Sequence, residues 1–167
     1  PYTTLFRSEK MAVNPDVVGK SAFYIAKASG ITVPEDTKIL IAKLPEPSLK
    51  YPLSLEKLSP VLAYFICEDS KQGFKYASQM LALGGLGHSA VIHSDDYELC
   101  KSYGNEMKVG RIIENAPSSQ GAIGDIYNTN TPSLTLGCGS YGRNSTTSNV
   151  SSVNLINRKR IAQRRVN

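Results

Sequence analysis

The sequence predicts an α/β fold, with an open three-layer sheet followed by a loop-rich C-terminal tail. Two observations support this prediction. Two segments are typical of strands buried on both faces: Lys38–Lys43, whose two lysines bracket four apolar residues, and the unbroken apolar run Val61–Cys67. Segments with helical periodicity lie before the first of these runs and between the strand-like runs that follow. This alternation favours parallel strands joined by right-handed crossovers, with helices layered over the sheet.

The expected helices carry their own start and stop signals. A first helix is predicted at Ser21–Ser29, where Ser21 is suited to cap the N-terminus and Gly30 to end the helix in a left-handed conformation. A second is predicted at Asp69–Leu83, because its apolar residues form one stripe and Gly84-Gly85 follows.

The remaining elements follow in the same alternating order. His88–His93 and Arg111–Glu114 are expected to be strands, with a helix at Asp95–Tyr103 between them. After Asn115, Gly, Ser, Asn, Thr and Pro dominate until apolar residues return at Leu155–Ala162. Long loops in a compact domain usually form a site or pack on a partner. We therefore expect a domain over residues 9–115, then a loop-rich site segment over 116–167 that ends in an oligomerisation strand.

The net charge of +5 lies at the C-terminal end. Five basic residues account for all of it, so the rest of the chain is neutral overall; they are Arg158, Lys159, Arg160, Arg164 and Arg165. A neutral body argues against a nucleic-acid-binding face. A basic terminal segment is more typical of a solvated edge strand or an oligomer contact.

Neither a membrane protein nor a metal site is expected. The longest strictly apolar stretch is Val61–Cys67, far shorter than the about 18 residues that span a bilayer, and no leader-like segment opens the sequence. Three widely spaced cysteines, Cys67, Cys100 and Cys138, form no Cys-x-x-Cys pair. This cysteine usage favours the reducing cytoplasm.

The first eight residues have a separate interpretation. Pro1–Ser8 matches the translation of the end of a common sequencing-library adapter. On this hypothesis the segment is an artefact and is excluded from fold reasoning. The alternative is a natural terminal strand with Leu5 and Phe6 in a core.

Gly137–Gly142 spells Gly-x-Gly-x-x-Gly, but its context does not fit a dinucleotide fingerprint. That motif needs a helix directly after it and an acidic residue about 20 positions further on. Arg143–Ser152 is rich in Asn, Ser and Thr, and no Asp or Glu follows Asp125. We expect a tight loop that brings backbone close to another segment. Cys138 within it is expected to pack rather than to act as a nucleophile.

His88 follows Gly84-Gly85-Leu86-Gly87 at the predicted junction of a helix and a strand. A histidine there can titrate near neutral pH and act as an acid or base. The alternative is a hydrogen-bonded structural histidine, which is how we interpret His93.

Four segments, taken together, closely resemble the aldehyde dehydrogenase half of bifunctional aldehyde-alcohol dehydrogenases, which lies in the CoA-acylating branch of the aldehyde dehydrogenase superfamily. They are Glu56-Lys57-Leu58-Ser59-Pro60, Gly84–His88, Ala116–Asp125 and Pro132–Gly142. The similarity runs from about Ala12 to Ala162. The sequence departs from the family pattern at Ala122 and Arg143, where glycines are usual, and at Tyr141, where tryptophan is usual.

The resemblance implies a reaction that interconverts acetaldehyde or a similar short aldehyde, CoA and NAD with acyl-CoA and NADH during alcohol fermentation. It implies that Glu56 binds the nicotinamide ribose hydroxyls, and that Leu58 and Leu136 contact the nicotinamide region. His88 matches the histidine beside the reactive cysteine, which deprotonates the CoA thiol or polarises the thioester.

In the family's order, the nucleophilic cysteine and the dinucleotide-binding domain precede Ala12. We therefore expect a fragment that carries half a site and is inactive alone, and that forms a homo-oligomer in the full-length enzyme. Two alternatives stay open: a stand-alone acylating dehydrogenase, such as one for succinate semialdehyde, and a non-catalytic basic binding module.

Overall fold

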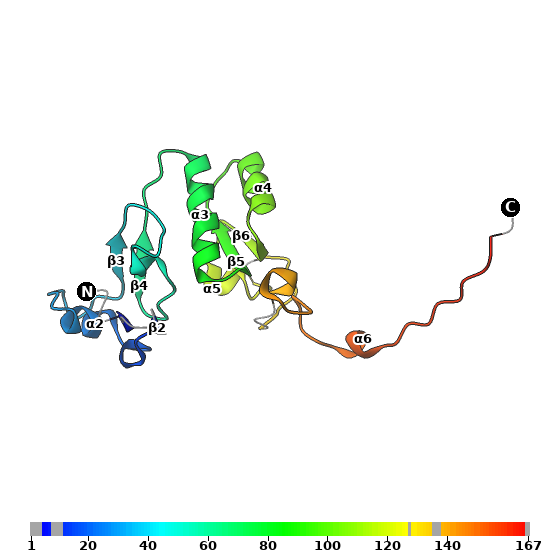
Figure 1. Cartoon of the computed structure of the whole chain (residues 1–167), viewed down its shortest axis with the longest axis horizontal. Coiled ribbons are helices and arrows are strands. Elements are labelled where there is room, and N and C mark those ends of the chain that lie inside the picture. Colours follow the sequence, from blue (N-terminus) through cyan, green and yellow to red (C-terminus); the bar gives the residue numbers. More distant parts are fainter. Residues whose placement is uncertain (1–4, 8–11, 127, 135–137, 166–167) are drawn as a thin grey trace.

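The computed structural model of the protein describes residues 5–7, 12–126, 128–134 and 138–165. The chain forms two lobes and an extended tail (Figure 1). The first lobe contains β1 (Phe6–Arg7), β2 (Ala12–Val13), η1 (Pro15–Val17), α2 (Ala22–Ala28), β3 (Leu40–Lys43), η2 (Pro52–Ser54) and β4 (Val61–Tyr64). The second contains α3 (Ser70–Gly84), β5 (Gly87–Ile92), α4 (Tyr97–Glu106), β6 (Val109–Glu114), α5 (Ser118–Gly121) and η3 (Gly139–Gly142); α6 (Ser152–Leu155) lies in the tail.

The strands form three open two-stranded sheets. β1 and β2 are antiparallel, whereas β3 pairs with β4 and β5 pairs with β6 in parallel. The registers place Leu40 beside Val61 and Gly87 beside Val109. The predicted α/β class with parallel strands is confirmed. The sheet is interrupted, because β4 and β5 are not paired with each other within the described residues.

Helices α2 and α3 begin after their predicted cap residues, and their bounds lie within one residue of the predicted ones. The Ser21 hydroxyl accepts a hydrogen bond from the Tyr24 amide at 3.2 Å, and Gly30 follows α2 with a φ of +73°. The Asp69 carboxylate accepts one from the Gln72 amide at 2.7 Å, which satisfies a backbone donor at the start of α3.

The prediction that these strands are buried on both faces is wrong for β3 and β4. Burial alternates along both strands. Ile41 is 67% exposed, and Leu62 and Tyr64 are each 51% exposed. Side chains alternate between the two faces of a strand. One face therefore packs on the first lobe's core, while no described segment covers the other.

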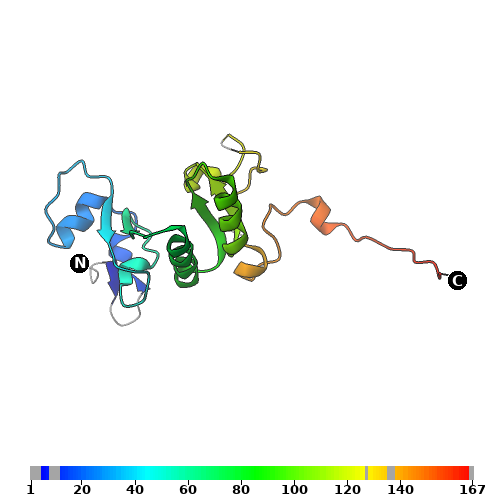
Figure 2. The ribbon, with the colours of Figure 1, turned by 90° about the horizontal axis from the view of Figure 1, so that it is seen from above.

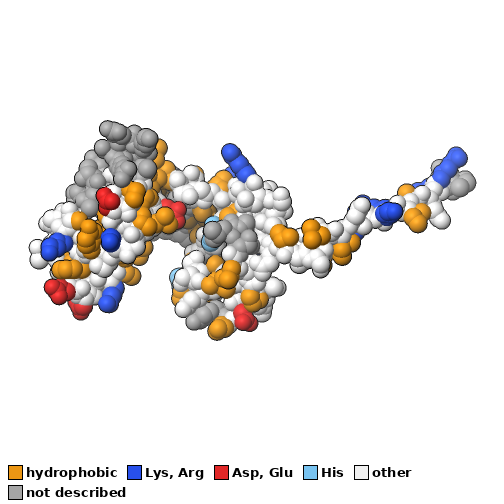
Figure 3. All heavy atoms as spheres, turned by 90° about the horizontal axis from the view of Figure 1, so that it is seen from below, with side chains coloured by type: hydrophobic (Ala, Val, Ile, Leu, Met, Phe, Trp, Pro, Cys, Tyr) orange, Lys and Arg blue, Asp and Glu red, His pale blue; other side chains and the backbone are white. Residues whose placement is uncertain are grey.

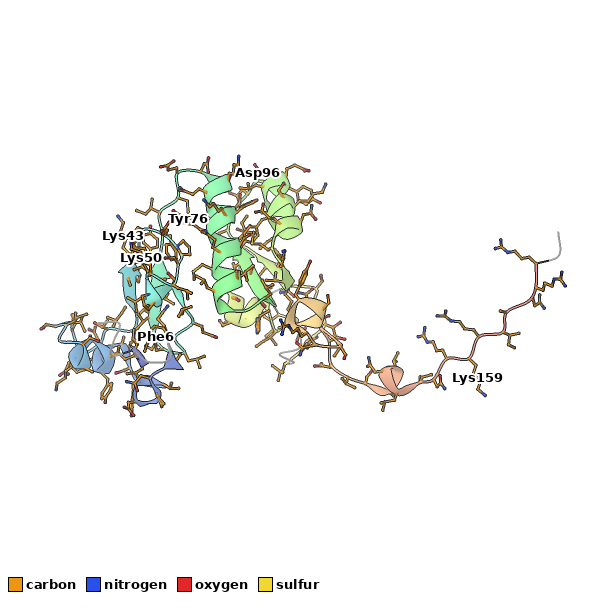
Figure 4. All side chains as sticks on the ribbon, viewed as in Figure 1. Phe6, Lys43, Lys50, Tyr76, Asp96 and Lys159 are labelled. Atoms are coloured by element: carbon orange, nitrogen blue, oxygen red, sulfur yellow. The ribbon has the colours of Figure 1, made fainter. Side chains whose placement is uncertain are left out.

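That core is one cluster beneath β3 and β4, formed by buried Leu5, Phe6, Val17, Ile25 and Val61. Figure 4 labels Phe6 at the base of this lobe. Leu5 and Phe6 are 4% and 2% exposed, so the core arrangement of the alternative interpretation is present. The adapter hypothesis concerns where residues 1–8 came from, which their packing does not test.

Aromatic contacts join the helices of the second lobe to each other and to the first lobe. The rings of Phe74 and Tyr103 meet edge to face at 5.1 Å between α3 and α4. Tyr76 of α3 points toward the first lobe (Figure 4), where its hydroxyl donates to the Pro45 carbonyl at 3.3 Å and its ring meets Phe65. These contacts hold α3 between the two parallel strand pairs.

The C-terminal segment runs away from both lobes (Figure 2). Residues 156–165 are all exposed, and Ile161 is 97% exposed. The only element in the described part of this tail is the short helix α6, so the oligomerisation strand expected at the end of residues 116–167 does not form in the single chain. A strand needs a hydrogen-bonded neighbour, and no described strand pairs with this segment. In the described part of the chain, no helix is long and apolar enough to cross a membrane.

Candidate functional site

An open groove of about 810 Å³ lies between the two lobes. Figure 3 shows the hollow between them, bordered by apolar side chains. The groove is lined by residues 54–59 and 61–63 of the first lobe, by Ala77, Met80, Leu81, Gly84, Gly85 and Leu86 at the end of α3, by residues 88–90 of β5, and by Tyr103 and Cys138. It thus brings together three segments that the sequence analysis singled out separately.

The polar lining lies at the amino ends of two parallel strands. Residues 54–59 directly precede β4, and His88 is the second residue of β5. Open α/β sheets usually bind ligands outside the carboxyl ends of their strands. This groove departs from that rule, because its polar lining lies at the amino ends of the strands.

Glu56 and Leu58 both lie in the loop between η2 and β4, and both are exposed. Leu58 has a φ of +46°, a left-handed conformation that a leucine rarely adopts, and it is 62% exposed. The Ser59 hydroxyl beside it is buried and has no hydrogen-bond partner among the described residues. The loop therefore offers a carboxylate, an apolar side chain and an unsatisfied hydroxyl near one another.

Lys57 was not identified from the sequence, because a lysine beside a glutamate is typical of a solvated surface. It is only 7% exposed. Its ammonium donates hydrogen bonds to the carbonyls of Leu53 at 2.5 Å and Leu55 at 2.8 Å. Burial lowers the pKa of Lys57 below its usual value, because the charged form loses water.

His88 is exposed at the groove, and its Nδ1 lies 2.9 Å from the Ser89 hydroxyl. That contact occupies one ring nitrogen and leaves Nε2 for a ligand. His93 follows β5 at its other end and does not line the groove. Of the two histidines, only His88 has the position of a candidate acid or base.

The glycine-rich loop packs against the start of β5. A Cβ added to Gly87 would lie 2.6 Å from the Cβ of Cys138 and 2.8 Å from the Gly142 amide nitrogen. The prediction of a close backbone approach is confirmed. The four-residue η3 is followed by Arg143 in a left-handed conformation, so no helix continues from the loop. Leu136, the remaining predicted contact, lies outside the described residues.

The chemistry of the lining fits the ribose end of a nicotinamide nucleotide. The Glu56 carboxylate can accept two hydrogen bonds from a ribose diol, and the Leu58 side chain offers apolar contact. Within the described ranges, no glycine-rich loop leads into a long helix whose N-terminus could hold a pyrophosphate. No group of three or more possible metal ligands occurs there either.

The chain resembles known acylating aldehyde dehydrogenases in sequence. It is 52% identical over 155 residues to the aldehyde-alcohol dehydrogenase of Streptococcus pneumoniae. The aligned region covers 93% of this chain and 18% of that relative. It is 36% identical over 159 residues to the acetylating succinate-semialdehyde dehydrogenase of Clostridium kluyveri, covering 95% of this chain and 34% of that one. No protein-family model matches the chain.

A solved structure has the same fold. The acetylating aldehyde dehydrogenase of Geobacillus thermoglucosidasius superposes with a TM-score of 0.80 and 36% identity, over 93% of this chain and 36% of that protein. The chain thus spans only about a fifth to a third of the length of these proteins. These matches confirm the resemblance found in the sequence: in both sequence and fold, the chain is similar to a segment of the CoA-acylating aldehyde dehydrogenases.

Proposed function

We propose that this chain supplies one half of the active site of an NAD-dependent, CoA-acylating aldehyde dehydrogenase. The reaction interconverts acetaldehyde or a similar short aldehyde, CoA and NAD with acyl-CoA and NADH. The observation that carries the proposal is the groove, because it gathers Glu56, Leu58 and His88 from two lobes. The 52% identity to a bifunctional aldehyde-alcohol dehydrogenase favours that class over a stand-alone succinate-semialdehyde enzyme at 36%.

Each side chain has a distinct task in this proposal. NAD supplies the acceptor for the hydride that leaves the aldehyde carbon. Glu56 accepts hydrogen bonds from the nicotinamide ribose and fixes the position of the ring, with Leu58 packed beside it. Nε2 of His88 takes the proton of the CoA thiol, which makes the sulfur nucleophilic toward the acyl group. The nucleophilic cysteine comes from a segment outside this chain, so Cys138 is not assigned that role.

A hybrid enzyme tests this function. In it, Ala12 to Asn167 of this chain replace the matching segment of the Streptococcus pneumoniae aldehyde-alcohol dehydrogenase, and residues keep the present numbering. We expect CoA-dependent NADH formation from acetaldehyde by the hybrid, and none by the isolated chain. A folded hybrid without this activity, or an active isolated chain, would contradict the proposal.

We also propose that the tail pairs with a second copy of the complete enzyme. The enzyme is proposed to act in the cytoplasm, where all three cysteines stay reduced. The exposed apolar Leu155, Ile156 and Ile161 support this proposal, since they gain burial on pairing. Removing residues 152–167 from the hybrid is expected to lower its oligomeric size. The tail is a basic binding module instead if the truncated hybrid keeps its oligomeric size but loses a retention on nucleic acid, at physiological salt, that the full hybrid shows.

A further inference from the structure

Lys57 is a buried cation in the loop that carries Glu56. Lysine is almost never buried unless it is paired. In the described part of the chain, the only ion pair joins Lys101 to Glu98, so Lys57 has no carboxylate partner there. Its ammonium is held instead by two backbone carbonyls, those of Leu53 and Leu55.

Those two bonds enclose the backbone on which Glu56 stands. Leu55 accepts from the ammonium and Lys57 carries it, so Glu56 lies between the acceptor and the donor of one hydrogen bond. The second bond reaches back to Leu53 in η2. Leu53 and Leu55 also pack against the core of the first lobe. Through the ammonium, the backbone at Glu56 is tied to that core.

Leu58, the residue after Lys57, shows that this loop has a strained backbone conformation. Leu58 holds a φ of +46° although most of its side chain is exposed and its packing gives little compensation. Such conformations cost energy and persist where the surroundings enforce them. The Lys57 hydrogen bonds are adjacent contacts able to do so.

An ammonium is a costly way to brace a loop. Moving the charge out of water carries a penalty, and an apolar side chain of similar length fills the same space without it. Its advantage is geometric, since one ammonium can donate to several carbonyls at once. The buried ammonium therefore fixes the conformation of the loop, but it contributes little to the free energy of unfolding.

We propose that Lys57 is a positioning residue, whose buried ammonium orients the backbone at Glu56 so that the carboxylate meets the nicotinamide ribose. This inference rests on the proposed function of Glu56. Although Lys57 is among the residues that line the groove, its ammonium is bonded to the carbonyls of Leu53 and Leu55 and has no direct role in binding nucleotide or substrate in this proposal. It acts through Glu56, so its loss weakens nucleotide binding more than it slows the chemical step.

The test uses the hybrid enzyme and measures NADH binding directly, by the change in NADH fluorescence. Lys57→Met is expected to raise the Kd for NADH about tenfold and the KM for NAD similarly, with a smaller fall in kcat. The midpoint of thermal unfolding is expected to stay level or rise, because the buried charge is gone. Lys43→Met is the control, since Lys43 is exposed and lies at the end of β3; it should leave the Kd unchanged.

Two further variants separate positioning from a structural role. Lys57→Ala leaves a space beside the two carbonyls, so millimolar ethylamine should partly restore NADH binding, while tetramethylammonium, which cannot donate a hydrogen bond, should not. In a double-mutant cycle, adding Glu56→Gln to Lys57→Met should weaken binding little further, because both changes remove the same interaction. Additive effects would overturn the inference.

The outcomes also distinguish this inference from the proposed function. If Glu56→Gln weakens NADH binding while Lys57→Met does not, Lys57 is not a positioning residue but the proposed site stands. If Glu56→Gln has no effect on binding, the proposed site itself is wrong. If Lys57→Met lowers the thermal midpoint by several degrees and ethylamine fails to restore binding by Lys57→Ala, Lys57 is only a structural residue.

Discussion

Gly87 and Cys138 are packed so closely that a Cβ on Gly87 would lie 2.6 Å from the Cβ of Cys138. Cys138 lies in the glycine-rich loop, and Gly87 opens β5 directly before His88. The contact therefore fixes the loop against the strand that carries the candidate acid-base residue.

Gly87→Ala should displace this loop, because a methyl group cannot fit there without movement. Gly85→Ala is a matched control: the φ of Gly85, +103°, is close to the +105° of Gly87, but no atom of the described residues lies within 4 Å of the added Cβ. Both variants carry the cost of a left-handed alanine, and only Gly87→Ala adds a clash. In the hybrid enzyme, we expect Gly87→Ala to lower the thermal midpoint by several degrees more than Gly85→Ala. Equal losses would mean that the loop moves freely.

Asn115 links the carboxyl ends of β5 and β6. Its side-chain amide donates to the Ser94 carbonyl and accepts from the Ser94 amide, each at 2.9 Å, and its φ is +52°. Asn115→Ala is expected to destabilise the protein by about 1–3 kcal/mol, because two backbone groups lose a partner and alanine disfavours this conformation. Asn115→Gly should destabilise less, since glycine adopts the same φ without strain. Denaturant unfolding of the hybrid measures both, and a larger loss for Asn115→Gly would contradict the strain argument.

Cys138→Ala should leave turnover of the hybrid largely intact. The Cβ that contacts the glycines is kept, and the proposed nucleophile lies outside this chain. The steady-state rate of CoA-dependent NADH formation measures the effect. A loss of several orders of magnitude in a variant that still folds would identify Cys138 as the nucleophile and overturn the assignment.

Glu56→Gln should weaken NAD binding while sparing the fold. Removing the charge from a ribose-binding carboxylate loses hydrogen-bond energy of about 1.5–3 kcal/mol. The exposed position of Glu56 makes a loss of thermal stability unexpected. The KM for NAD and the thermal midpoint report the two effects separately. An unchanged KM with unchanged turnover would reduce Glu56 to a surface charge.

Local signals in the sequence predicted the positions of helices and strands well. Contacts between segments that are distant in the sequence could not be predicted in the same way. Ser21 caps the start of α2 and Gly30 follows its end, so the limits of this helix depend on neighbouring residues alone. An apolar run such as that around Ile41 indicates a strand, but it does not say whether the segment that covers its outer face lies in the same chain. The two-face burial was predicted incorrectly for that reason.

The candidate site shows the same division. Glu56 and His88 were found because their motifs are local, whereas their meeting in one groove depends on how two lobes pack. Lys57 was missed because its burial follows from the path of the backbone at Leu53 and Leu55. Nothing in the residues around Lys57 distinguishes it from a solvated lysine.

His88 gives the sharpest test of the acylating assignment. If its Nε2 takes the proton of the CoA thiol, His88→Ala in the hybrid should slow acyl transfer by roughly 10²- to 10⁴-fold, the usual range for one acid-base group. Hydride transfer should suffer less. Single-turnover measurements separate the steps, because NADH formed before CoA is added reports the first half-reaction and later acyl-CoA reports the second.

The exposure of His88 makes the outcome informative, since removing an exposed ring should cost little stability. Ser89→Ala is a companion variant, because it removes only the hydroxyl 2.9 Å from Nδ1. We expect a smaller loss of acyl transfer from it, as the ring stays in place but loses an orienting contact. If both half-reactions of His88→Ala fall equally and the thermal midpoint drops by several degrees, His88 is a structural residue at the helix-strand junction. If neither half-reaction changes, the proposed site reduces to Glu56 and its apolar neighbours.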